Sequence, residues 1–308
     1  MTRIVAISGS GRSGSTLLSL LLSQSDRAFN LGQHRHLPAA WRDDAPCSCD
    51  QPLHGCTVYA PVMDAVFGPR AESDIRAFGA AGRRFFKAAG RTRDWHDPQG
   101  LDRLRQAHQD YLAPLARLVD AIADATGAET LIDSSKTPEM ALAFHLIAPG
   151  ELLLLNLVRD PRAVAVSWNL KKGSRRDTFS NARKWLQRQK RLSDWGPALG
   201  ARFRQLRYED FAAAPEQQIA LVHDWAGLVM PPALFPEPDR ATLSWGRQHL
   251  FPPANEKVLA ERKSDVPIRP SMGWRDPGHS WEHRIALLAT RPLARQIYPA
   301  LEDAPPPS

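Results

Sequence analysis

Cysteine is scarce in this chain of 308 residues, which contains only 3: Cys47, Cys49 and Cys56. An odd count without an export signal does not make a disulfide framework, so we expect reduced thiols. Their spacing lacks the paired Cys-x2-Cys signature of a zinc site, although His54 could complete four ligands. We therefore predict no metal requirement, with buried thiols or one local disulfide at these positions.

Long apolar runs are also absent. The longest aliphatic string, residues 152–158, is interrupted by Asn156 and is much shorter than the about 18 residues that a membrane helix requires. Near the N-terminus, three glycines and Arg12 interrupt the stretch before the apolar residues 17–22, which is unlike a signal peptide. We expect a soluble, cytoplasmic protein.

The composition otherwise matches an ordinary globular protein, with 43% hydrophobic and 24% charged residues. Lysine and arginine number 40 against 33 acidic residues, which gives a net charge of +7 and favours partners that carry phosphate, sulfate or carboxylate. The length allows one large core or two small ones. We predict a single domain over residues 1–303 and a frayed, proline-rich tail at 304–308.

Short apolar strands alternate with helical patterns along the chain, as in parallel α/β proteins. Between residues 30 and 65 the pattern is irregular, and residues 30–100 are expected to form an insertion. Residues 231–278 suit a long surface segment that could lie over a ligand. The sequence predicts a three-layer α/β fold, P-loop-like, with a mostly parallel central sheet and helical insertions. The expected strands are residues 4–8, 130–133, 152–158 and 203–207, and the expected helices begin at Leu17 and cover 99–125, 161–172, 179–195 and 215–228.

A glycine-rich loop follows the first expected strand. Gly9, Gly14, Ser15 and Thr16 have the spacing Gly-x4-Gly-Ser-Thr, which is typical of a loop whose backbone N–H groups and helix N-terminus hold an anion. The lysine of a nucleotide-hydrolysing loop is replaced by Ser15, while Arg12 offers donors from inside the loop. The alternative is a tight strand-to-helix turn without a ligand.

A second group of polar residues follows the strand at 152–158. Arg159 stands at the carboxyl end of that strand, where ligands bind in open α/β sheets. Asp160 and Pro161 suit the start of a helix, and Ser167, about two turns on, points toward the same edge. Arg159 could instead be the ion-pair partner of a nearby acid.

Together, the loop and the Arg159…Ser167 pair resemble the sulfotransferases that use 3′-phosphoadenosine 5′-phosphosulfate (PAPS), over most of the chain. In that family the loop grips the 5′-phosphosulfate and the Arg…Ser pair grips the 3′-phosphate. The resemblance implies PAPS as a co-substrate that leaves as adenosine 3′,5′-bisphosphate. The implied donor-binding positions are Arg12, Ser13, Gly14, Ser15, Thr16, Arg159 and Ser167.

Two further stretches resemble the branch that contains tyrosylprotein, carbohydrate and bacterial sulfotransferases. Tyr208, in Tyr-Glu-Asp, corresponds to a tyrosine near the nucleotide. Residues 261–270, within a segment of roughly 250–278, resemble the C-terminal clamp of that branch. Ser264 and Arg269 would there reach the cofactor phosphates, Arg269 standing where the branch often has lysine. Tyr208 could alternatively only pack against the sheet.

Sulfonate transfer needs positive charge near the leaving phosphate and a base for the acceptor proton. Lys136 precedes Thr-Pro, as does the lysine that faces the bridging oxygen in the family, and Arg12 is the second cation. Where many relatives carry Gly-Glu, this chain has Gly-Gln33. A neutral His34 is the predicted base, His36 the reserve, and the remaining alternative is that Gln33 only orients the acceptor.

A run of basic residues has one acid, Asp177, within it. Such a run is most often a solvated helix face, and the alternatives are contact with an anionic polysaccharide or membrane surface. Few aromatic side chains are interleaved with the run, so nucleic acid is not expected as a partner. The basic residues are Lys171, Lys172, Arg175, Arg176, Arg183, Lys184, Arg188, Lys190 and Arg191.

The sequence thus predicts a sulfotransferase that acts on a hydroxyl or amine of an unidentified carbohydrate, lipid or peptide, without a metal. A P-loop kinase of a small metabolite is the first rival, but it requires Mg²⁺ and a loop lysine, which is missing. The second rival is an inactive protein that binds an anionic nucleotide or a polyanion, as Gln33 and the basic run suggest.

Overall fold

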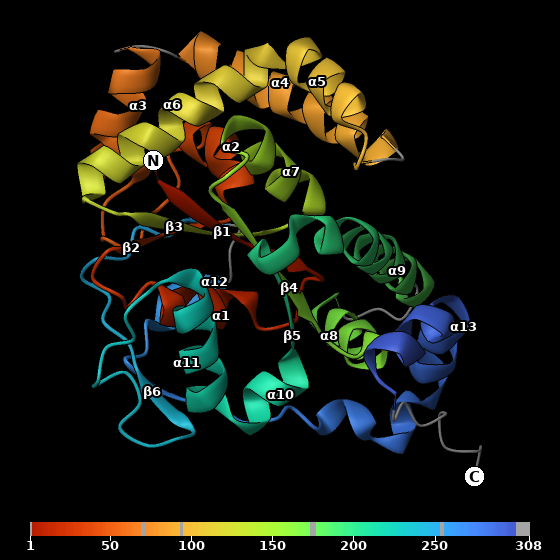
Figure 1. Ribbon diagram of the computed structural model, residues 1–308. Helices are drawn as coiled ribbons and strands as arrows, with labels where there is room; N and C mark the ends of the chain where they lie inside the picture. The colour runs from red at the N-terminus through yellow and green to blue at the C-terminus, as the bar shows by residue number, and fades with distance from the viewer. Residues whose placement is uncertain (1, 69–71, 93–94, 173–176, 253–255, 300–308) are drawn as a thin grey trace.

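A parallel sheet of five strands runs through the centre of the molecule in the order β2-β3-β1-β4-β5 (Figure 1). The structure, a computed structural model, describes residues 2–68, 72–92, 95–172, 177–252 and 256–299. The predicted α/β fold with a parallel sheet is confirmed. The strands are β1 (Arg3–Gly9), β2 (Ala28–Gly32), β3 (Thr130–Lys136), β4 (Leu152–Val158) and β5 (Phe203–Arg207).

Strand β2 was not expected, because residues 30–65 have no regular sequence pattern. All of its residues are buried, Asn30 included. A strand covered on both faces shows no alternation of polar and apolar residues, and five residues are too few for a clear apolar run. Packing between two layers of helices therefore determines this strand more than its local composition does.

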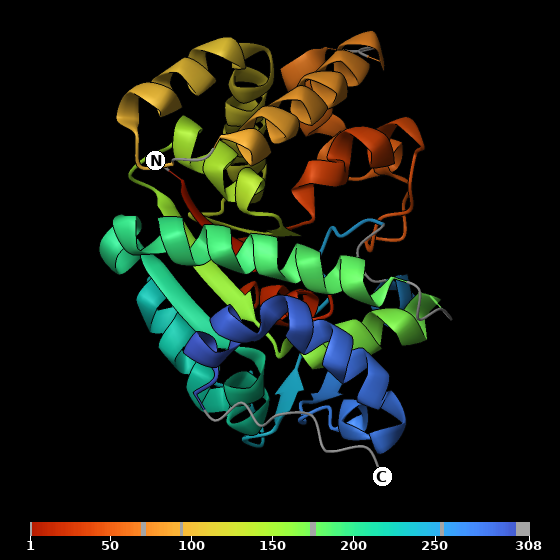
Figure 2. The same ribbon diagram turned by 90° about the vertical axis from the view of Figure 1, so that its right-hand side faces the viewer.

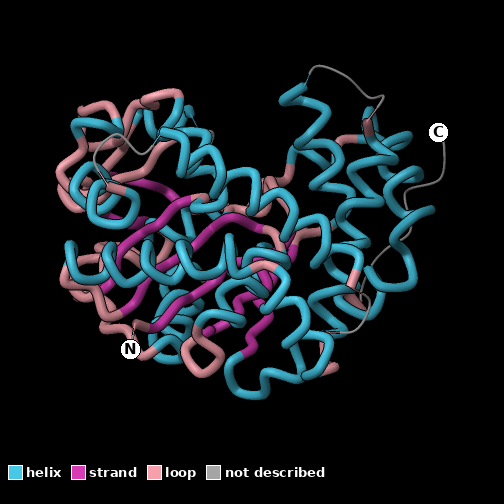
Figure 3. The backbone as a smooth tube through the Cα atoms, turned by 90° about the horizontal axis from the view of Figure 1, so that it is seen from above, coloured by secondary structure: helices cyan, strands magenta, loops and turns pink. Residues whose placement is uncertain are grey.

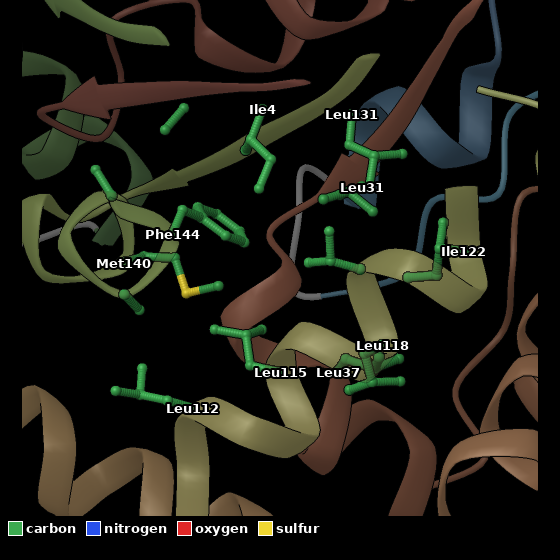
Figure 4. Close-up of a cluster of buried hydrophobic side chains, with 14 of the residues drawn as sticks. Ile4, Leu31, Leu37, Leu112, Leu115, Leu118, Ile122, Leu131, Met140 and Phe144 are labelled. Atoms are coloured by element: carbon green, nitrogen blue, oxygen red, sulfur yellow. The ribbon is translucent and has the colours of Figure 1, made fainter. Parts of the chain in front are cut away.

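Helices between β2 and β4 cover one face of the sheet (Figure 1). Leu112, Leu115, Leu118 and Ile122 project from one of them toward the strands, as Figure 4 shows. The long helix predicted at 99–125 is two helices that meet at His108; the apolar stripe continues across the break and so conceals it. This layer contains α2 (Leu37–Arg42), α3 (Tyr59–Phe67), α4 (Glu72–Arg91), α5 (Pro98–Ala107), α6 (Gln109–Thr126) and α7 (Pro138–Ile147), with the 3-10 turns His34–His36 and Leu53–Gly55.

The opposite face is covered by α1 (Ser15–Leu22), α10 (Tyr208–Ala213) and α11 (Pro215–Ala226) (Figure 1). Every residue of α1 except Leu17 is buried. This helix therefore lies between the sheet and the outer elements, and the loop before it is fixed at both ends. A second hydrophobic core holds the layer together.

Three helices form a group beside β4 and β5, as Figures 2 and 3 show: α8 (Pro161–Lys172), α9 (Thr178–Trp195) and α13 (Ser280–Ile297). The first two match the sequence prediction; α13 was not expected. A 3-10 segment, Gly196–Arg202, connects α9 to β5. None of the described helices is both long and apolar enough to span a bilayer.

The segment 231–278 lies partly on the surface, as predicted, but it also contributes to the core. Leu234, Phe235, Leu243 and Ile268 are buried against the layer of α1 and α11. The long segment is therefore anchored along its length. Its regular elements are short: β6 (Arg240–Thr242), β7 (Asp265–Pro267), α12 (Glu256–Glu261) and the 3-10 turns Gly273–Arg275 and Pro277–His279. The predicted tail at 304–308 lies outside the described residues.

Gly9, the last residue of β1, should be intolerant of any side chain. Its φ is +136°, and a Cβ there would lie 2.2 Å from the carbonyl oxygen of Leu157. Gly9→Ala is expected to lower the free energy of unfolding by more than about 2 kcal/mol, because the conformation and the backbone contact both oppose it. Urea denaturation would measure this change.

Gly150→Ala provides the control, since Gly150 has open space around its Cβ position and no positive φ. It should unfold near the wild-type urea midpoint. Equal midpoints for the two variants would contradict the close packing of β1 against β4.

Candidate functional site

The glycine-rich loop between β1 and α1 lies at the carboxyl edge of the sheet. Gly14 precedes α1 with φ +85°, and a Cβ there would lie 3.2 Å from the ring of Tyr208. A Cβ at Gly11 would lie 2.9 Å from the ring of Trp168. The loop is thus confined between two aromatic side chains, and its glycines allow this approach.

Several polar atoms around this loop are buried and have no hydrogen-bond partner among the residues that the structure describes. The hydroxyl oxygens of Ser10, Ser13 and Thr16 are in this state, as are Thr137 Oγ1 and Arg159 Nε. The side chain of Ser13 is fully buried. Buried polar atoms are nearly always paired, so this set of donors fits a ligand with several acceptor oxygens.

The side chains of two arginines meet at the loop and are held there by hydrogen bonds. Arg12 Nε donates to Ser167 Oγ at 3.0 Å, and an Arg159 guanidinium nitrogen donates to the Arg12 carbonyl at 2.7 Å. The Arg159 guanidinium lies 4.3 Å from the centre of the Tyr208 ring. The structure therefore brings Arg12, Arg159, Ser167 and Tyr208 together, as the sequence predicted.

Lys136, the last residue of β3, also faces this group. Its backbone is left-handed, with φ +67°. Burial lowers the pKa of Lys136 to about 8; Asp133 opposes that shift, whereas Arg188, Arg12 and Arg35 add to it. Burial, followed by the charge of Arg159, lowers the pKa of Arg12.

Arg188, on α9, is a member of the site that the sequence analysis missed. It was counted in the solvated basic run, but its guanidinium donates to the Gly9 carbonyl at 3.3 Å, and burial lowers its pKa. Helical spacing indicates that Arg188 faces inward, because it lies three residues after buried Trp185 and four before buried Leu192. This position belongs to the inner face of α9.

The other basic residues of the run differ in whether they face the protein interior or the solvent. Arg191 also turns inward, donates to the Gly90 and Thr92 carbonyls and stacks over Trp95. Lys171, Arg183, Lys184 and Lys190 are exposed, whereas Arg175 and Arg176 lie outside the described residues. The run is therefore only in part the solvated face that was predicted.

The cations of the site outnumber the acids near them, since Asp133 lies near Lys136 and Glu139 lies near Arg188. Arg12, Lys136, Arg159 and Arg188 form no salt bridge with any described residue; Asp160, the nearest acid in sequence to Arg159, pairs with Arg162 at 2.8 Å. The ion-pair alternative for Arg159 is thus not supported. Like charges held together favour an anion between them.

The histidine segment after β2 is attached to β3. The backbone N–H of His34 donates to Asp133 Oδ1 at 3.3 Å, and that of Arg35 donates to Ser135 Oγ at 3.3 Å. Asp133 Oδ1 also accepts from Ser135 Oγ at 2.6 Å, and burial raises the pKa of Asp133 to about 6. Asp133, which the sequence analysis did not single out, thus holds the backbone at His34, and the charge of Lys136 acts on the neighbouring His36.

Both candidate bases are neutral near pH 7. Burial lowers the pKa of His34 to about 4, and both ring nitrogens are buried without partners. The pKa of His36 is also about 4, lowered by burial and by the charges of Arg35 and Lys136. A cavity of about 250 Å³ lies beside them, lined in part by Phe86 and Tyr111. This cavity is the candidate acceptor pocket.

The predicted clamp residues have other contacts. The Ser264 carbonyl accepts from the Leu243 N–H at 2.7 Å, and the Arg269 guanidinium lies 3.7 Å from the Asp239 carboxylate. Within the described part of the chain, no hydrogen bond or ion pair joins either residue to the loop. Their donor-binding role stays a prediction.

Comparisons with known proteins identify the family and the fold of this chain. A family model described as "Sulfotransferase family" matches residues 5–232, whereas no curated protein matches. The sulfotransferase domain of the Synechococcus PCC 7002 olefin synthase superposes with a TM-score of 0.51 at 18% identity, over 90% of this chain and 88% of that one, which shows a shared fold.

Two further solved structures are similar at lower TM-scores. They are the sulfotransferase domain of the curacin biosynthetic pathway (0.45, 18% identity, 93% of this chain and 96% of that one) and sulfotransferase STF9 from Mycobacterium avium (0.45, 14% identity, 85% and 76%). The family model covers well over half of the residues. This chain therefore belongs to the sulfotransferase family.

Proposed function

We propose that this sulfotransferase moves the sulfonate group of PAPS to a hydroxyl or amine of an acceptor. One observation carries the proposal: loop hydroxyls, buried and without a hydrogen-bond partner among the described residues, lie among four cations that form no salt bridge with any of those residues. A donor with phosphate groups at both ends of its ribose supplies the missing acceptors and charge.

The residues present fit such a donor. Arg12, Ser13, Gly14, Ser15 and Thr16 would hold the 5′-phosphosulfate through backbone N–H groups, hydroxyls and one guanidinium. Arg159 and Ser167 would hold the 3′-phosphate, with Tyr208 packed against the Arg159 guanidinium. Ser264 and Arg269 would complete the donor site from the C-terminal clamp. The donor supplies a sulfonate that is already activated by a phosphate leaving group.

The chain contributes charge and a proton acceptor. Lys136 and Arg12 would offset the negative charge that grows on the leaving phosphate. A pKa of about 8 keeps most of Lys136 charged at pH 7. His34 would take the acceptor proton, with His36 in reserve, since neutral imidazoles can accept one. Direct in-line attack requires no covalent enzyme intermediate.

The rival functions account for less of the site. A kinase needs a loop lysine, and Ser15 occupies that position. An inactive polyanion binder does not need the two histidines beside a pocket of about 250 Å³. Carbohydrate, lipid and peptide acceptors all carry the required hydroxyl or amine, and a peripheral contact with an anionic polysaccharide or membrane would use the exposed lysines of α8 and α9.

Adenosine 3′,5′-bisphosphate should bind in the absence of metal, and more tightly than ATP with Mg²⁺. Arg159→Ala and Arg188→Ala are each expected to weaken this binding roughly 10- to 100-fold, because each removes a charged donor or buried charge facing the phosphates. Calorimetric titration would measure the affinities. Arg183→Ala is the matched control, since Arg183 is exposed on the same helix as Arg188.

Wild-type affinity in the Arg159→Ala and Arg188→Ala variants, or a preference for ATP with Mg²⁺, would refute the assignment of the donor site.

The binding of adenosine 3′,5′-bisphosphate should depend on pH through Lys136. Its lowered pKa of about 8 means that the free protein loses this charge as the pH rises through 8. A bound anion favours the charged form, so binding at pH 8 should take up protons and affinity should fall above that pH. Calorimetry in buffers of different ionisation enthalpy would count the protons.

Lys136→Arg keeps the charge at all these pH values and should abolish the uptake. The same uptake in wild type and variant would show that another group titrates.

The base can be identified once an acceptor has been found by screening. His34→Gln is expected to lower kcat by roughly 10²- to 10⁴-fold while leaving the affinity for adenosine 3′,5′-bisphosphate unchanged. His36→Gln, which alters the same cavity, is the control. A large loss in His36→Gln instead would assign the proton transfer to His36, and no loss in either variant would leave Gln33 as an orienting group only.

A further inference from the structure

The three cysteines converge on one histidine, and it is not His54. The possible ligand atoms of Cys47, Cys49, Cys56 and His249 all lie within 4.8 Å of one another. The Cys47 and Cys56 sulfurs are 3.8 Å apart, and His249 Nδ1 is 3.9 Å from the first and 3.2 Å from the second. The sequence analysis considered His54 as the fourth ligand, but its Nε2 lies 2.8 Å from the Trp41 carbonyl oxygen.

These separations match the edges of a tetrahedron around a metal ion. Zinc bonds of about 2.3 Å to sulfur and about 2.0 Å to nitrogen place two sulfurs about 3.8 Å apart and a sulfur and nitrogen about 3.5 Å apart. The sulfur pair agrees with the first value, and the two sulfur–nitrogen distances lie on either side of the second. The cysteines are free thiols, so a disulfide does not explain their proximity.

The surroundings hold these side chains in place. Cys47, Cys56 and His249 are buried, and Cys49 is half-buried. The Tyr59 backbone N–H donates to the Cys56 sulfur at 3.4 Å. A tight turn joins the first two ligands: the Cys47 N–H donates to the Gln51 carbonyl at 2.8 Å, and Asp50 adopts φ +66°. Such support is typical of a built site.

We infer that Cys47, Cys49, Cys56 and His249 bind one structural zinc ion. Three thiolates and one imidazole form a donor set that suits zinc, whereas iron–sulfur clusters are held by four cysteines in most proteins. The protein fills all four positions, so no position is left for water or substrate, and the role is structural. This inference is independent of the proposed donor, since it uses none of the cations at the glycine-rich loop.

The site joins two distant parts of the chain. Cys47, Cys49 and Cys56 belong to the insertion at residues 30–100, on the acceptor side of the proposed site. His249 belongs to the segment 231–278 and lies shortly before the predicted clamp at 261–270. Ser48 connects the same two parts: its N–H donates to the Leu250 carbonyl at 2.8 Å, and its hydroxyl donates to the Gln248 carbonyl at 2.7 Å. Zinc would fasten the cysteine segment at residues 47–56 to the chain around His249.

The test is the metal content of the full-length protein, produced with zinc in the medium and purified without chelators. Elemental analysis should find about one zinc ion per chain. Cobalt(II) in place of zinc should give the thiolate charge-transfer and visible bands of a tetrahedral site. Cys56→Ser and His249→Ala should weaken zinc binding by more than about 100-fold, because each removes a ligand. His54→Ala is the matched control and should keep the metal.

Several results would overturn the inference. They are a wild-type protein that stays free of zinc after incubation with an equal amount of the ion, bound iron in place of zinc, a Cys47–Cys56 disulfide found by mass spectrometry, or equal zinc loss in His54→Ala and His249→Ala. The wild-type measurements decide the question even if a variant does not fold. Unchanged bisphosphate binding in zinc-free protein would separate this site from the donor site.

Discussion

The constraint on which this structure depends is a cluster of positive charges that form no salt bridge with any described residue. Arg12, Lys136, Arg159 and Arg188 come from a loop, two strand ends and a helix, yet they converge on one small volume. Backbone carbonyls hold two of them, because Arg159 donates to Arg12 and Arg188 donates to Gly9. Carbonyl oxygens orient a guanidinium without neutralising it, so its positive charge stays available to an anion. The left-handed backbones of Arg12 and Lys136 add strain of the kind that collects at functional sites.

The parallel register of the sheet brings these charges together. Lys136 pairs with Ser8 at the end of β1, and Leu157 pairs with Gly9. The carboxyl ends of β1, β3 and β4 are therefore level with one another, and the loop, Lys136 and Arg159 emerge side by side. The separate hydrophobic cores on the two faces keep the strands in this register. Mutual repulsion among the cations is thus opposed by packing some distance away from them.

Local patterns in the sequence predicted the parts of this arrangement that are encoded by neighbouring residues. The glycine-rich loop, the strand before Arg159 and the Thr-Pro that follows Lys136 are each contiguous, so residue spacing identified them. Strand β2 and the break at His108 were missed, because burial on both faces and a continuous apolar stripe conceal them. Arg188 shares a helical spacing with Trp185 and Leu192, but this signal could be used only once the inward face of α9 was known. His249 lies far along the chain from the cysteines it meets, and no local pattern connects them.

The low pKa values of His34 and His36 bear on how proton removal and stabilisation of the leaving group would contribute to the proposed reaction. An imidazole whose pKa is about 4 is neutral and ready to accept a proton, but it is a weak base at neutral pH, and weak bases contribute less to a rate. Burial weakens both histidines as bases, and the positive charges that further weaken His36 would, in the proposed reaction, stabilise a departing phosphate. A single electrostatic environment thus favours the leaving group over the attacking group. In the proposed reaction, Lys136 and Arg12 would support the departing phosphate, while His34 would still take the acceptor proton in a site where Gln33 cannot.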